Sequence, residues 1–96
     1  MNDLLHEFTT EVGDEDGHRY LARAMGRQRK GATVWEGWLE FSPRGGGGVV
    51  RKSPIETTQP NREALVYWAS GLERVYLEGA LERAITARIE GRARSK

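Results

Sequence analysis

The sequence predicts a small α+β domain in which a three-stranded antiparallel meander is followed by a C-terminal helical segment. Alternating apolar and polar residues fill three runs between residues 18 and 56, and turn-forming residues separate these runs. After Pro60 the apolar spacing changes to that of a helix. The chain has 96 residues, enough for a single domain with a modest core, so self-association is a further route to stability.

Residues 1–17 are distinguished by charge, since they carry Asp and Glu but no Lys or Arg. We interpret them as an acidic leader before the domain at 18–90. Leu4, Phe8 and Val12 are four residues apart, which leaves room for a short N-terminal helix. The Gly13–Gly17 stretch is typical of a loop.

The first strand is expected at residues 18–27. Leu21 and Met25 lie four residues apart, which a helix would also explain. A strand is favoured because the next two segments have strand patterns and a sheet needs partners. Residues 28–32 form the turn.

The second strand, at residues 33–42, has the clearest pattern in the chain. Side chains alternate between faces, so Trp35 falls with Leu39 on the expected core side. Trp38 falls on the other face, between Glu36 and Glu40. A large aromatic residue in such a polar setting is often covered by a helix, another subunit or a ligand.

The third strand is expected at residues 48–56, where Pro54 indicates a sheet edge or a bulge because proline cannot donate to the ladder. The glycines at 45–48 precede this strand. A phosphate-binding loop would precede a helix, so we interpret them as a hairpin connection.

The helical segment is expected at residues 60–90, with Pro60 in its first turn and Thr58 or Gln59 as cap. Gly71 either kinks one long helix or separates two. Residues 91–96 form a basic tail. The expected core comprises Leu21, Trp35, Leu39, Phe41, Val49, Leu65, Trp68, Leu72, Leu77, Leu81 and Ile85.

The candidate binding residues combine charge with an aromatic side chain on the first two strands and the following edge. They are Trp38, Glu36, Glu40, Arg19, Arg23, Arg27, Arg29, Lys30, Arg51 and Lys52. Two interpretations follow. The first is a non-enzymatic module that forms a homodimer or binds a protein partner through its sheet face or helix. The second is a single-stranded nucleic-acid binder, in which a basic groove is combined with aromatic stacking.

The order of strands followed by a C-terminal helix resembles the PC4 and Whirly class of single-stranded DNA-binding proteins. The resemblance extends over about residues 18–89 in element order alone, and no residue roles are carried over. Cross-strand pairs argue against a basic groove, because Arg19 and Arg23 could lie near Glu36 and Glu40 and be neutralised.

The sequence shows no catalytic or cofactor motif. It has no cysteine, and its two histidines lack the spacing of a zinc site, although His18 follows Asp14 and Asp16 closely. We therefore expect no metal, no cofactor and no enzymatic activity. An enzyme using the polar junction from Glu56 to Asn61 is a third alternative, set against simple helix capping.

The apolar runs are shorter than a membrane span and no secretory signal is visible, so we expect a cytoplasmic protein without membrane contact.

Overall fold

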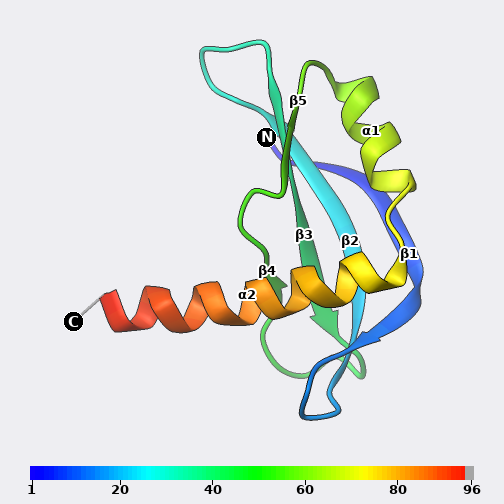
Figure 1. Ribbon diagram of the computed structural model, residues 1–96, viewed down its shortest axis with the longest axis vertical. Helices are drawn as coiled ribbons and strands as arrows, with labels where there is room; N and C mark the ends of the chain where they lie inside the picture. Colours follow the sequence, from blue (N-terminus) through cyan, green and yellow to red (C-terminus); the bar gives the residue numbers. More distant parts are fainter. Residues whose placement is uncertain (95–96) are drawn as a thin grey trace.

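The computed structural model describes residues 1–94, and side chains as far as residue 87. A five-stranded antiparallel sheet carries both helices on one face (Figure 1). The elements are β1 (Asp3–Gly13), β2 (Arg19–Gln28), β3 (Trp35–Pro43), β4 (Arg51–Lys52), β5 (Thr57–Gln59), α1 (Arg62–Ser70) and α2 (Arg74–Arg94). The strands follow the order β1-β2-β3-β4, and β5 also pairs with β3. The predicted α+β class is confirmed.

The possibility of a short N-terminal helix is wrong, because residues 3–13 form strand β1, which is antiparallel to β2. Register shifts between Leu4 and His6, and again between Glu7 and Glu11, show that β1 contains bulges. Each extra residue changes the face to which the following side chains point. Leu5, Phe8 and Val12 therefore all contact the core, although their spacing resembles that of a helix.

The second expected strand is confirmed as β3. The third expected strand is interrupted near Pro54, where a sheet edge or a bulge was predicted. Residues 51–52 and 57–59 pair separately with β3 as β4 and β5. The segment between them stays attached to β3, because Ser53 N–H donates to the Leu39 carbonyl and Glu56 N–H donates to the Gly37 carbonyl, each at 2.8 Å.

Two separate helices meet near Gly71, so the alternative of one long helix with a kink at that glycine is wrong. The cap of α1 is Asn61 rather than Thr58 or Gln59, and its side-chain oxygen accepts from Ala64 N–H at 2.8 Å. Helix α2 crosses the sheet and extends past its β4 edge (Figure 1). It continues to Arg94, through most of the expected basic tail, and residues 95–96 lie outside the described part of the chain.

The helices pack on what we call the inner face of the sheet. Small residues there, such as Ala22 and Ala24, are fully covered. Gly26 and Gly37 are partners across β2 and β3, and a Cβ on either would overlap the buried Leu65 side chain of α1. The glycine pair therefore forms a recess for Leu65. The opposite face, which carries Arg23, Met25, Glu36, Trp38 and Glu40, is called the outer face.

Much of the expected core is buried on the inner face, including Leu39, Phe41, Leu65, Leu77 and Leu81. Trp68, Leu72 and Ile85 pack at its margin. The prediction that Leu21 and Val49 belong to the core is wrong, because their side chains are 43% and 47% exposed. Trp35, also expected in the core, is only half-buried. Leu21 lies on the outer face and Val49 lies in the loop before β4.

Candidate functional site

The outer face is the surface of the sheet that neither helix covers in residues 1–94, since both helices lie on the inner face (Figure 1). Strand register determines which side chains share it. Met25 lies opposite Trp38, Arg23 opposite Glu40, and Arg27 opposite Glu36. On β1, Leu4 is the partner of Met25 and Glu7 is the partner of Arg23.

Trp38 is only 2% exposed although it points away from both helices. Its ring is covered by the Arg27 guanidinium at 5.3 Å and the Lys52 ammonium at 5.4 Å from the centroid. Its Nε1–H donates to Glu40 Oε2 at 3.0 Å. Long charged side chains can cover apolar surface in this way while their heads remain in water. Trp38 is thus covered by side chains of its own sheet, which were not among the covers considered from the sequence.

Ion pairs surround this tryptophan. Arg23 Nη2 lies 3.4 Å from Glu40 Oε1, so the predicted cross-strand neutralisation of Arg23 is confirmed. Glu36 accepts from both Arg29 at 3.0 Å and Arg27 at 3.3 Å. The hydrogen bond from Arg29, and after it the one from Arg27, holds the pKa of Glu36 below its usual value despite partial desolvation.

Three predicted binding residues, Arg19, Lys30 and Arg51, lie away from Trp38. Arg19 shares the outer face but lies at the hairpin end of β2, far along the strand from Glu36, so the register keeps it away from that carboxylate. Lys30 is exposed in the β2–β3 turn. Arg51 is the partner of Phe41 and therefore lies on the inner side, apart from Lys52, which is the partner of Glu40.

Three outer-face residues were missed by sequence reasoning. Leu21 was assigned to the core, Met25 was placed in the first strand without a role, and Glu7 was assigned to the leader. Strand pairing would have identified them, because Glu7, Arg23, Glu40 and Lys52 form one row across four strands with alternating charge.

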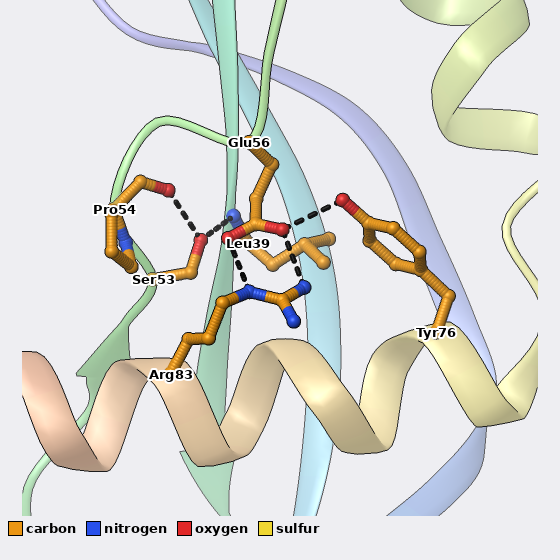
Figure 2. Close-up of polar contacts among 6 residues, drawn as sticks. All are labelled: Leu39, Ser53, Pro54, Glu56, Tyr76 and Arg83. Atoms are coloured by element: carbon orange, nitrogen blue, oxygen red, sulfur yellow. Dashed lines mark hydrogen bonds and ion pairs between the residues drawn. The ribbon is translucent and has the colours of Figure 1, made fainter.

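Glu56 forms the second polar cluster, between the β4–β5 connection and α2 (Figure 2). Its carboxylate is 5% exposed and accepts from the Tyr76 hydroxyl at 2.6 Å. Arg83 donates to both oxygens, at 2.6 and 3.1 Å. The nearby Ser53 hydroxyl accepts from Leu39 N–H at 2.9 Å and donates to the Pro54 carbonyl at 2.8 Å.

These contacts determine the ionisation of the Glu56 cluster. Burial works to raise the pKa of Glu56, but the hydrogen bonds from Arg83 and Tyr76 outweigh it and the pKa is lowered. Burial, followed by the hydrogen bond to Glu56, raises the pKa of Tyr76 to about 12. Glu56 is therefore held as a carboxylate that joins the sheet edge to α2, and the alternative role in helix capping belongs to Asn61 instead.

Asp14, Asp16 and His18 meet in the β1–β2 hairpin, with potential ligand atoms within 4.8 Å of one another. Asp14 Oδ1 accepts from the backbone N–H groups of Asp16 and His18, at 3.0 and 2.8 Å. Its second oxygen lies 3.1 Å from His18 Nδ1 and 3.3 Å from the Tyr20 hydroxyl. The carboxylate is thus occupied in shaping the turn.

Comparison with known protein families, curated proteins and solved structures finds no match to this chain. Among residues 1–94, neither helix has the length and apolar character needed to cross a membrane.

Proposed function

We propose that the protein is a non-enzymatic binding module whose outer face contacts another protein chain. The observation that supports this best is the arrangement around Trp38, where paired charges surround a central aromatic and aliphatic row on an uncovered sheet. Leu4 and Leu21, on the same face, are 45% and 43% exposed. Protein interfaces commonly combine an apolar centre with charged groups that are paired at the rim.

The charge pairs favour a protein over a polyanion as the partner. Arg23, Arg27 and Arg29 already contact Glu36 or Glu40, so phosphate groups would approach carboxylates as well as guanidinium groups. Nucleic-acid affinity depends on cations that can neutralise phosphates. The stacking position is also occupied, because Arg27 and Lys52 lie over the Trp38 ring.

The Glu56 cluster supports a role without catalysis. A general base needs a carboxylate with a pKa near the working pH and free access to a substrate proton. The pKa of Glu56 is lowered, and both its oxygens are occupied, because Arg83 donates to each of them and Tyr76 donates to Oε1.

The test uses a photo-crosslinking amino acid at Leu21 on the outer face, with the exposed Tyr67 of α1 as the matched control position. We expect the Leu21 probe to join a protein chain that can be identified by mass spectrometry and shown to bind again in purified form. Binding should weaken in Glu40→Arg. Equal crosslinking from Tyr67, or no protein crosslink from Leu21, would contradict the proposal.

The nucleic-acid alternative has its own measurement. Fluorescence anisotropy with a labelled thirty-nucleotide oligothymidine should show no saturable binding at low salt, where electrostatic binding is strongest. Tight binding that falls steeply with added salt and is lost in Arg19→Glu would favour that alternative instead.

A further inference from the structure

The charges on the outer face have an order that points to its partner. One row runs Glu7, Arg23, Glu40 and Lys52 across four successive strands, so acid and base alternate from one edge to the other. A second row places Arg27 on β2 beside Glu36 on β3. Between the two rows lies an apolar row with Leu4, Met25 and Trp38.

We infer that the outer face binds a second copy of this chain, face to face, around a two-fold axis that runs parallel to the strands between β2 and β3. This inference rests on the proposed function and names its partner. Such an axis places β2 of one copy over β3 of the other. Arg23 then faces Glu40 of the second copy, and Arg27 faces Glu36 of the second copy.

The same axis also matches the outer strands and the centre. Glu7 on β1 faces Lys52 of the second copy, since both lie at the ends of the charged row. Met25 faces Trp38 of the second copy in the apolar row. Contact between them requires Arg27 and Lys52 to rotate away from the Trp38 ring that they cover in the single chain. Sulfur and aromatic side chains then contact each other favourably. Every charge of the two rows meets its opposite, as a self-complementary two-fold interface requires.

The other two-fold arrangement in the plane of the face does not have this property. An axis perpendicular to the strands, along the Met25–Trp38 row, would exchange the two charged rows. Arg23 would face Arg27 of the second copy, and Glu40 would face Glu36. Like charges in such positions oppose association. Charge order therefore selects the axis parallel to the strands.

The size of the face agrees with a reversible dimer. Strands β1, β2 and β3 have 11, 10 and 9 residues, whereas β4 has 2. Three strands about 4.8 Å apart and about 30 Å long, with β4 beside them, present roughly 450 Å². Two copies would bury about 900 Å², which is the size of a weak, transient interface. An axis parallel to the strands also keeps the two sheets nearly aligned, which is the common geometry of sheet packing.

A charge-swap pair tests the inference directly. Sedimentation equilibrium of the purified chain should give a mass near twice 10.8 kDa at high micromolar concentration. Arg23→Glu alone puts acid opposite acid across the axis, and Glu40→Arg alone puts base opposite base. We expect each variant to dimerise at least tenfold more weakly, whereas an equimolar mixture should form a mixed dimer as tight as the original.

The rescue in the mixture separates a lost contact from a lost fold, because only folded chains can complement each other. Arg74→Glu, a charge reversal on the exposed start of α2, is the matched control and should leave the dimer unchanged. A monomer at high micromolar concentration, or a mixture without mixed dimers, would overturn the inference. If the Leu21 probe then captures a different, verified protein, the proposed function stands and only the identity of the partner is wrong.

Discussion

The two faces of the sheet come from the same strands but are shielded from water in different ways. Leu39 on the inner face is fully buried, and its neighbour Trp38 on the outer face is almost as well covered. Helices cover Leu39, whereas the side chains of Arg27 and Lys52 cover Trp38. A helix layer is removed only by unfolding, but a long side chain can rotate away. Similar burial therefore corresponds to a permanent core on one face and a removable cover on the other.

The largest expected difference between the faces is in the cost of removing a leucine. Leu65→Ala should lower the free energy of unfolding by about 2–5 kcal/mol, because the side chain is fully buried. The matched outer-face change, Leu21→Ala, should stay within about 0.5 kcal/mol. Urea unfolding followed by tryptophan fluorescence measures both. Equal costs would contradict the distinction between the two faces.

The recess beneath Leu65 provides a sharper form of this measurement. Gly37→Ala should cost about 1–3 kcal/mol, because its Cβ would overlap Leu65 and come close to Trp68 and Thr57. The cost should shrink when Leu65 is already Ala. An unchanged cost in the double variant would indicate that Leu65 is not the obstructing group.

An effect smaller than that of Leu65→Ala is expected at the Glu56 cluster, which joins the sheet edge to α2. Glu56→Gln should cost about 1.5–3 kcal/mol at neutral pH, because it removes hydrogen bonds between charged groups. Folding lowers the pKa of Glu56, so its stabilisation is present at neutral pH and is lost as the pH falls below the usual value of 4.5.

Tyr76 affects the alkaline side of the same profile. Its pKa rises from 10.0 to about 12, so folding favours the protonated phenol. This stabilisation is complete below pH 10 and is lost as the pH rises toward about 12. Tyr76→Phe should remove this loss of stability between pH 10 and about 12. The loss of stability at acid pH, which depends on Glu56, should remain. An unchanged alkaline limb in this variant would contradict the assignment.

The smallest effect is expected at the cover of Trp38. Lys52→Ala should cost less than about 1 kcal/mol, in keeping with a cation–π contact near the surface. It should nevertheless increase quenching of Trp38 fluorescence by acrylamide, measured in a chain where Trp35 and Trp68 are Phe. Lys30→Ala, in the β2–β3 turn, is the control and should change neither quantity. Unaltered quenching in Lys52→Ala would mean that Lys52 does not shield the ring.

Sequence reasoning succeeded where the period of the pattern survives in the fold. The two central strands, the break at Pro54 and the helix boundary near Gly71 were all predictable, because local chemistry decides them. Strand β1 was not, since its bulges give Leu5, Phe8 and Val12 a spacing that imitates a helix.

For the candidate site, the sequence predicted which face of the sheet each side chain lies on but not how deeply each side chain is buried. Alternation correctly separated Trp35 from Trp38, yet Trp38 is the more buried of the two. Its cover comes from Arg27 and Lys52, on neighbouring strands, and depends on register. The partners of Glu56 likewise lie 20 and 27 residues away, at Tyr76 and Arg83.

The placement of both helices after the sheet has a consequence for synthesis. The strands leave the ribosome first, and their inner face, with Tyr20, Leu39 and Phe41, then has no α1 or α2 to pack against. An uncovered apolar sheet is prone to aggregate. The growing chain therefore passes through a vulnerable interval that ends when Leu65 and Leu81 arrive.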